Sequence, residues 1–290
     1  MKYLIINADE YGLTEGVNNA IIDCVKAGVV TSTTVIVNGP GMYHAVQHLP
    51  VLSEKRVSVG LHFNLTLGLP VSEKVPSLVS AEGKFYPRKS LCLKLPFGQV
   101  SRSEVMDELV AQWNRLVEVG ITPSHLDGHE HVHILPGIIE SVLAFAVERH
   151  IPIRMPCEKS IINRSMPVSL YPKFVKKQLA KFLARRAGHK MDEVGVWHPS
   201  EFLSIFSVLE NPVPDLHTYE AIFRHIRPGV SELMCHPALD DPELFRYSEI
   251  ADRNFLESRF LLSPTFTDLI ERYGVQLTSY FQGGNCARDI

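Results

Sequence analysis

The sequence predicts an α/β protein folded as one irregular (β/α) barrel, similar in plan to a TIM barrel, with an active site at the carboxyl ends of its strands. Two observations carry this prediction. Strand-like and helix-like segments alternate along the chain, and polar side chains recur where the strand-like segments end. A chain of 290 residues with 45% hydrophobic content suits one such barrel, and without a repeat or linker we expect a single domain over residues 1–290.

The predicted strands are short apolar or β-branched runs separated by turn residues and helical patterns. Such runs are typical of the buried strands of a parallel sheet, whose connections are helical. They cover residues 3–8, 31–38, 57–63, 124–129, 151–156, 232–237 and 275–280.

Helical periodicity fills the gaps between the strands. Apolar residues within 17–25 recur at i, i+3, i+4, i+7 and i+8, and Gly28 ends that helix. Ser103 is the expected cap of a helix that runs to about Val119, and residues 138–149 form another helix.

Two further segments stand out by composition. Residues 66–99 are a long excursion with proline and glycine, which predicts a loop or lid over the site. Residues 173–190 are the most basic stretch, which favours a surface helix with a charged outer face over a phosphate-binding segment. The apolar residues expected on the inner face of that helix are Phe174, Leu179, Phe182 and Leu183.

Composition excludes several classes of function. The formal net charge is −3, from 29 basic and 32 acidic residues, so nothing suggests binding to nucleic acid or to an anionic membrane. The five cysteines are scattered and form no C-x-x-C pair, which indicates a reducing compartment. The apolar run within the first ten residues is too short for the core of a signal peptide. No other apolar run approaches the length of a membrane-spanning segment, so we expect a cytoplasmic protein.

Polar residues occupy equivalent places in the predicted sheet, at or near the ends of strands. The carboxyl ends of parallel strands meet on one rim, so residues spread over more than two hundred positions would converge there. The residues in this position are Asp9, Glu10, Asn38, His62, Asp127, His129, Arg154 and His236.

The stretch "HLDGHEHVHILPG" concentrates histidines in one place. An extended backbone would turn Asp127, His129, His131 and His133 to the same side, a plausible donor set for a divalent metal. A solvated loop or a hydrogen-bonded core network is the competing structural interpretation.

The remaining polar residues suggest hydrolytic chemistry. Two histidines and one carboxylate form an open ligand set that leaves positions for water and substrate. Adjacent Asp9 and Glu10 could divide the tasks of metal ligand and general base, although an N-cap of the following helix would equally place acids there. His236 could protonate a leaving group near neutral pH.

The chain resembles the YdjC-like (ChbG-like) carbohydrate deacetylases nearly from end to end. The motifs that carry this resemblance, in order, are "INADEYGLTEGVNNAI", "GVVTSTTVIVNGP", "VGLHFNLTLGLPV", "PSHLDGHEHVHILPG", "ELMCHPALDDPEL" and "LLSPTFTDLIERYGVQLTSY".

The resemblance implies a (β/α) barrel with one divalent metal that removes N-acetyl groups from amino sugars such as chitooligosaccharides, and a homodimer. It implies that Glu10, His62 and His129 bind the metal. It implies Asp9 as general base, His236 as acid and Arg154 as the residue that orients or tunes the base. His131, His133 and Asp127 would then brace the ligands by hydrogen bonds.

One motif departs from the family pattern, which usually reads Ala-Asp-Asp-Phe-Gly where this chain reads Ala-Asp-Glu-Tyr-Gly at residues 8–12, and the change to Glu10 is the one that bears on the metal site. Glu10 is longer than aspartate by a methylene, so it either ligates with a shifted geometry or yields its place to Asp9. Ligand chemistry favours zinc or another borderline ion, whereas the resemblance points to magnesium.

Two other functions compete with the deacetylase. One is a different metal-dependent hydrolase, such as a phosphoesterase, which needs more cationic groups than Arg154 alone to hold phosphate. The other is a non-catalytic sugar-binding or regulatory protein whose metal site Glu10 has impaired.

Overall fold

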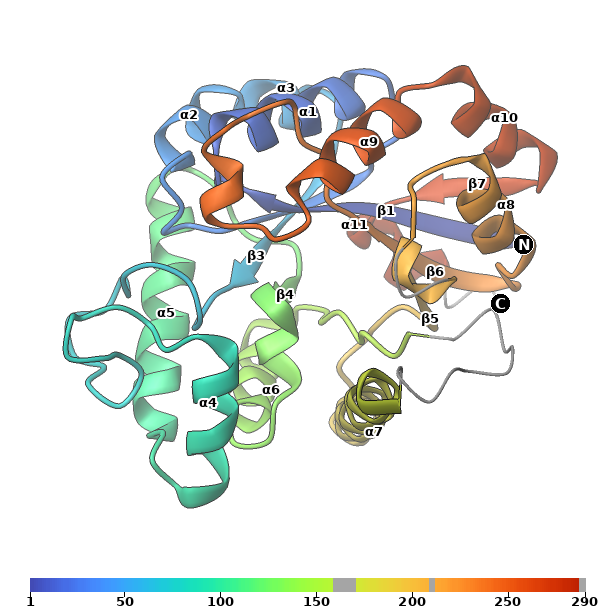
Figure 1. Ribbon diagram of the computed structural model, residues 1–290. Helices are drawn as coiled ribbons and strands as arrows, with labels where there is room; N and C mark the ends of the chain where they lie inside the picture. The colour runs from blue at the N-terminus through green and yellow to red at the C-terminus, as the bar shows by residue number, and fades with distance from the viewer. Residues whose placement is uncertain (159–170, 209–211, 287–290) are drawn as a thin grey trace.

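A seven-stranded parallel sheet forms the centre of the computed structural model, which describes residues 1–158, 171–208 and 212–286 (Figure 1). All strand pairings in it are parallel, as predicted. The strands are β1 (Lys2–Tyr11), β2 (Ser32–Val35), β3 (Ser58–Phe63), β4 (Leu126–Gly128), β5 (Glu201–Leu203), β6 (Gly229–Cys235) and β7 (Val275–Thr278).

Helices surround the sheet and connect its strands. Figure 1 shows α1, α2, α3 and α9 on one side, α4, α5 and α6 near β3 and β4, and α7 beside β5. The α-helices are α1 (Glu15–Lys26), α2 (Met42–Gln47), α3 (Leu49–Glu54), α4 (Arg88–Lys94), α5 (Arg102–Glu118), α6 (Ile139–Arg149), α7 (Tyr171–Glu193), α8 (Leu216–Arg224), α9 (Ala251–Leu261), α10 (Pro264–Arg272) and α11 (Tyr280–Cys286). The 3-10 helices are η1 (Leu95–Phe97), η2 (His129–Ile134), η4 (Ile205–Ser207) and η5 (Leu244–Arg246).

The strand order is β4-β3-β2-β1-β6-β5, and β7 pairs with β1. Strand β1 pairs with β7 along residues 2–5 and with β2 farther on. Ile153 and Glu158, which follow β4 in the chain, form two isolated parallel bridges, Leu126 to Ile153 and Glu158 to Phe202, between the two edges of the sheet. The predicted barrel is therefore confirmed as an irregular one. The strand predicted at 151–156 is wrong in extent, because only single bridges form there.

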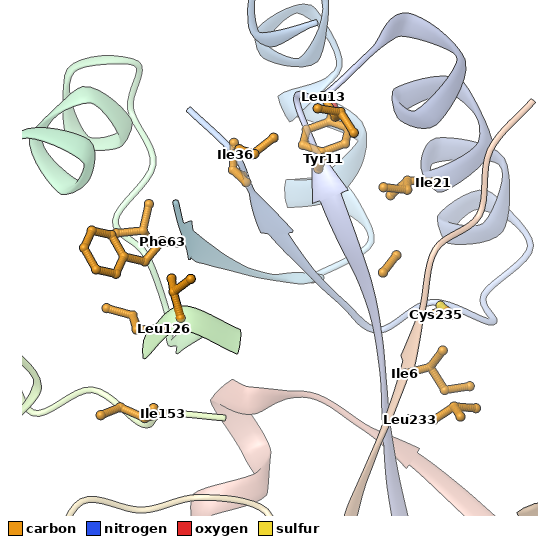
Figure 2. Packing of buried hydrophobic residues seen from close by; sticks show 14 of the residues in the cluster. Ile6, Tyr11, Leu13, Ile21, Ile36, Phe63, Leu126, Ile153, Leu233 and Cys235 are labelled. Carbon is orange, nitrogen blue, oxygen red and sulfur yellow. The ribbon is translucent and has the colours of Figure 1, made fainter. Parts of the chain in front are cut away.

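The two faces of β1 bury different kinds of side chain. Leu4, Ile6 and Ala8 belong to the main apolar cluster, which also contains the buried faces of the surrounding helices. Figure 2 shows Ile6 beside Leu233 and Cys235 of β6 in that cluster. This alternation has period two, as a strand requires.

The opposite face of β1 points into the barrel. Ile5 packs there in a small apolar cluster with Val230 and Tyr280. The next inward residues are Asn7 and Asp9, both buried and joined by a 2.8 Å hydrogen bond from Asn7 Nδ2 to Asp9 Oδ1. The barrel interior is thus apolar at the amino end of β1 and polar toward its carboxyl end.

The helix termini correct two sequence predictions. Thr14, not Asp9 or Glu10, caps α1, because its side chain accepts from the Val17 backbone N–H. Ser101, not Ser103, caps α5 by accepting from the Glu104 N–H. Helix capping therefore does not account for the Asp9–Glu10 pair.

Helix α7 has the predicted position, and of the residues predicted on its inner face Leu183 packs half-buried against the core, whereas two others are exposed. Leu179 and Phe182 are 57% and 60% exposed, whereas the small residues Ala184 and Ala187 are buried. The side chain of Phe174 lies outside the described residues. Within the described part of the chain, no helix is both long and apolar enough to cross a membrane.

Candidate functional site

Three predicted ligands meet at the carboxyl end of the barrel. Glu10 near the end of β1, His62 on β3 and His129 after β4 place one ligand atom each within 4.8 Å of one another. His62 is buried, and the other two side chains keep 11–12% of their surface exposed. Two imidazoles and a carboxylate on an accessible rim match an open metal site.

The backbone turns sharply where β1 presents its acids. The register between β1 and β2 shifts between Ala8 and Tyr11, and Glu10 has a positive φ of 71°. A residue inserted into a strand in this way re-aims the side chains on either side of it. Asp9 therefore stays in the barrel interior while Glu10 reaches the histidines.

His62, one of the predicted ligands, forms a hydrogen bond with Asp127, one of the residues expected to brace the ligands. Its Nδ1 lies 2.8 Å from Asp127 Oδ1, which leaves Nε2 free to bind a metal. Thr34 Oγ1 donates to Asp127 Oδ2 at 3.0 Å and fixes that carboxylate. Burial disfavours protonation of His62, but the charge and hydrogen bond of Asp127 outweigh it and raise the pKa of His62. Metal-binding histidines in proteins commonly have such a carboxylate partner.

Glu10 and His129 lie close together without a well-aligned hydrogen bond. The Oε1 atom of Glu10 is 3.2 Å from His129 Nδ1, and that nitrogen is buried with no hydrogen-bond partner. Burial raises the pKa of Glu10, yet His129, together with His236 and His62, lowers it to about 2. An ionised carboxylate next to an unpartnered ring nitrogen fits a shared cation.

A second set of possible ligands, Asp9, His62 and Asp127, also comes within 4.8 Å, but it lies deeper and is fully buried. Its carboxylates are already neutralised by Arg154, which contacts Asp9 at 2.6 Å and Asp127 at 2.7 Å. A metal there would have to compete with a buried guanidinium. The set that contains Glu10 is therefore the better candidate.

Arg154 is the central cation of the barrel interior and is fully buried. It donates to both oxygens of Asp9 and, through Nε, to Glu232 Oε1 at 2.8 Å. Desolvation works against its charge, but Asp127, Asp9 and Glu232 raise the pKa of Arg154 well above its usual value. The structure thus places Arg154 against the predicted base, and its role in catalysis stays a prediction.

His236 follows β6 and faces Asp9 from the other side. Its Nε2 atom lies 3.9 Å from Asp9 Oδ2, and its side chain is 17% exposed. Its backbone N–H donates to Glu257 Oε2 of α9 at 2.7 Å. The structure therefore brings the predicted acid, which is partly exposed, close to the predicted base, which is buried.

The side chains of His131 and His133 do not point to the same side as that of His129, as an extended strand would require. Residues 129–134 form η2 instead of an extended strand, and Glu130 and His131 have positive φ values of 49° and 58°. His133 Nε2 donates to the Arg154 carbonyl at 3.0 Å. The ring of His131 packs edge-on against Phe202, and its buried Nδ1 has no hydrogen-bond partner. The extended alternation predicted for this stretch is wrong.

Sequence reasoning missed several buried polar residues of the site. Glu232 joins Arg154 to the Tyr280 hydroxyl, and Glu257 joins the His236 backbone to the Tyr219 hydroxyl. His125 stacks on Tyr280 and lies 3.3 Å from Asn7 Oδ1. The one available signal was a single acid within a mostly apolar strand, as at Glu232 in β6.

The excursion at residues 66–99 is tied down at several points. Glu108 of α5 accepts from the backbone N–H groups of Val71 and Ser72, and Leu78 and Leu91 are fully buried in the core. The role of the excursion as a lid stays a prediction.

Comparison with known proteins places the chain in a family. The model of the family described as YdjC-like protein matches residues 3–272. A carbohydrate deacetylase of Geobacillus stearothermophilus is 31% identical over 96% of this chain and 97% of its own. A chitooligosaccharide deacetylase of Yersinia enterocolitica is 32% identical over 96% and 98%.

A solved structure is similar to this chain along almost its whole length, in agreement with the sequence matches. A candidate cellobiose-phosphate cleavage protein of Enterococcus faecalis superposes with a TM-score of 0.75 at 27% identity, over 97% of this chain and 98% of that one. The resemblance inferred from the motifs is therefore confirmed, and the chain belongs to the YdjC-like family.

Proposed function

We propose that this protein is a metal-dependent hydrolase that removes N-acetyl groups from amino sugars, with chitooligosaccharides as the substrate class. The observation that carries the proposal is the convergence of Glu10, His62 and His129 beside Asp9 and His236. The deacetylase names of full-length relatives support the same activity.

Glu10, His62 and His129 would hold the cation in this proposal. When bound, a divalent cation supplies Lewis-acid activation of the acetyl carbonyl and of water. Two imidazoles and a carboxylate are suitable ligands for zinc, and the family resemblance points to magnesium. Both ions are therefore tested in the activity assay.

Asp9 is the proposed base, and its two oxygens differ. Oδ1 accepts from Asn7 and from Arg154, whereas Oδ2 accepts from Arg154 and faces His236. A carboxylate oxygen has two lone-pair directions, so Oδ2 keeps capacity to take a proton from water. Arg154 holds the carboxylate in place while it does so.

His236 is the proposed acid. Its partly exposed ring lies on the side of Asp9 that faces away from the barrel interior. The hydrogen bond from its backbone N–H to Glu257 holds the backbone in place. An imidazole is a common general acid, and here it would give a proton to the departing sugar amine. The acetyl group then leaves as acetate.

The phosphoesterase alternative is weaker in this geometry. Arg154 is buried and already contacts three carboxylates, so it is not available to bind a phosphate. The four described cysteines are free thiols, which supports the further proposal that the protein works in a reducing cytoplasm.

Acetate release from N-acetylated chitooligosaccharides tests the proposal. The protein is assayed as isolated, after chelation, and after addition of zinc or magnesium. We expect activity that is lost on chelation and restored by at least one ion. Oligosaccharide binding without acetate release under every metal condition would favour the non-catalytic alternative instead.

A further inference from the structure

The chain just beyond the proposed metal ligand His62 leaves the sheet while it is still buried. Strand β3 ends at Phe63, which pairs in register with Gly128 of β4, and its pairing with β2 stops at Leu61. Asn64 follows outside these pairings and is fully buried. The backbone N–H and C=O of Asn64 therefore need partners outside the sheet, because a buried backbone group without a partner is costly.

Gln112 of α5 supplies both partners. Its Oε1 accepts from the Asn64 N–H at 3.0 Å, and its Nε2 donates to the Asn64 carbonyl at 2.7 Å. Figure 1 shows α5 beside the end of β3, although 48 positions separate the two residues. Gln112 is itself fully buried, and its amide takes the place that a residue of an adjacent strand would have.

The same amide connects this strand end to the excursion at residues 66–99. Gln112 Nε2 also donates to Glu108 Oε1 at 2.7 Å, one turn earlier on α5. Glu108 in turn accepts from the backbone N–H groups of Val71 and Ser72. The Gln112 amide thus meets one donor with its oxygen and two acceptors with its two N–H groups, which fixes its orientation.

Asn64 uses its own side chain to hold the first residues of the excursion. Its Oδ1 accepts from the backbone N–H groups of Thr66 and Leu67. Its Nδ2 donates to the Leu67 carbonyl and to Asn38 Oδ1, beyond the end of β2. A buried polar network in which the members are paired favours one arrangement of the backbone. The end of β3 is therefore held from α5, from the excursion and from the end of β2.

His62 depends on this anchoring because it lies two residues before Asn64 on the same strand. Asp127 binds its Nδ1 and so fixes the rotation of the ring, but it does not fix the backbone that carries the ring. The pairings with β2 and β4 hold that backbone up to Phe63, and Gln112 holds it beyond. A metal site requires ligand distances to be right within roughly 0.2 Å, so the strand end must be held closely.

We propose that Gln112 is a positioning residue for the metal ligand His62 and acts by pairing with the backbone of Asn64. The inference rests on the proposed function for the identity of the metal site. In the competing interpretation, Gln112 satisfies two buried backbone groups and contributes only to the stability of the fold. The two interpretations differ in what a change at Gln112 does to the bound metal.

Two variants remove the pairing to different degrees. Gln112→Met keeps the length and the helix propensity of the side chain but removes its hydrogen bonds. Gln112→Asn keeps the amide but is shorter by one methylene, roughly 1.5 Å, so it cannot reach both backbone groups, and it is the milder change for folding. Trp113→Leu is the matched control, because Trp113 is buried on the same helix and packs against Phe145 of α6.

Metal affinity is measured by competition with a chromophoric chelator, and the absorption spectrum of the cobalt-loaded protein reports the geometry of the ligands. Urea unfolding of the metal-free proteins shows how far each variant is destabilised. We expect both Gln112 variants to bind zinc about tenfold more weakly and to shift the cobalt bands, because loss of a group that orients a ligand typically has this effect. Trp113→Leu should lose stability and keep the wild-type affinity and spectrum.

Wild-type affinity and spectrum in both Gln112 variants would overturn the inference, as would an equal loss of affinity in Trp113→Leu. Failure of the proposed function gives a different result. Weaker metal binding in the Gln112 variants, without acetate release from any of the proteins, would keep the positioning role and reject the deacetylase. Metal-dependent acetate release with unchanged metal affinity in the Gln112 variants would reject the positioning role alone.

Discussion

Arg154 donates one hydrogen bond to each oxygen of Asp9, both at 2.6 Å, across 145 positions of sequence. The same guanidinium contacts Asp127 at 2.7 Å and Glu232 at 2.8 Å. One buried cation therefore compensates three buried carboxylates, which come from β1, β4 and β6. The fixed geometry of the guanidinium makes Arg154 the group that sets the position of the proposed base.

Replacement of Arg154 should therefore strongly reduce the stability of the folded protein. Arg154→Met leaves the carboxylates buried without their cation, and we expect a loss of about 3–5 kcal/mol in the free energy of unfolding, measured in urea. Arg272→Met is the control, because Arg272 is 59% exposed in its contact with Glu220 and should cost less than about 1 kcal/mol. Equal stability of the two variants would contradict this view of the barrel interior.

His129 should be required for the metal. His129→Ala leaves Glu10 and His62, and two ligands make a poor site, so metal content after dialysis should fall severely. His217→Ala, a change at an exposed position of α8, should keep full occupancy. Elemental analysis gives the answer, and full occupancy in His129→Ala would rule out the assigned ligand set.

The two adjacent acids should fail in different ways. Asp9→Asn should retain metal and abolish turnover, whereas Glu10→Gln should lose metal. Glu10→Asp restores the second aspartate of the usual family motif and should keep metal and preserve or raise acetate release. The extra methylene amounts to roughly 1.5 Å, and a misplacement of about 1 Å can cost on the order of a hundredfold in rate.

Metal analysis and acetate release are measured on the same preparations of these three variants. If Asp9→Asn loses the metal while Glu10→Gln keeps it, the roles of the two acids are reversed. If none of the three changes affects acetate release, the mechanism is wrong.

Glu257 should make stability depend on pH. Burial is the main cause that raises its pKa above 4.5, and hydrogen bonds from Tyr219 and the His236 backbone only partly offset it. The folded protein thus holds this proton more tightly than the unfolded chain. Its contribution is complete below pH 4.5 and is lost as the pH rises through the raised pKa, with a slope of up to about 1.4 kcal/mol per pH unit.

Glu257→Gln keeps the shape of the side chain without a charge. We expect the stability of the variant relative to the wild type to increase from pH 4.5 upward, as followed by urea unfolding at a series of pH values. Glu249→Gln, at an exposed position, provides the baseline. A stability difference that does not change with pH would show that Glu257 is ionised in both states or in neither.

The excursion at residues 66–99 should depend on Glu108 for its position. A complete deletion would also remove the core residues Leu78 and Leu91, so a point variant is the cleaner test. Glu108→Leu removes the acceptor for Val71 and Ser72. We expect faster tryptic cleavage within 66–99, weaker turnover of oligosaccharide and unchanged metal content, with Glu118→Gln as control. Unchanged cleavage and turnover would remove the support for a lid.

The sequence by itself determined the alternation of strands and helices, because hydrophobic periodicity records which faces are buried. It also determined which residues meet, since parallel strands present all their carboxyl ends on one rim. The convergence of Glu10, His62 and His129 was predictable for this reason, although they come from three separate strands. Their selection as the ligands, and the bracing role expected of Asp127, came from the family resemblance.

Only the tertiary structure decided the contacts that depend on packing between distant segments. Residues 129–134 alternate as a strand would, yet they form η2, where His133 donates to the Arg154 carbonyl. Helix α7 buries Ala184, Ala187 and Met191 and leaves Leu179 and Phe182 exposed, because its position against the rest of the fold decides which face is covered. Glu232 and Glu257 are single acids whose partners lie far away in sequence, and no local pattern encodes the pairing of a buried charge.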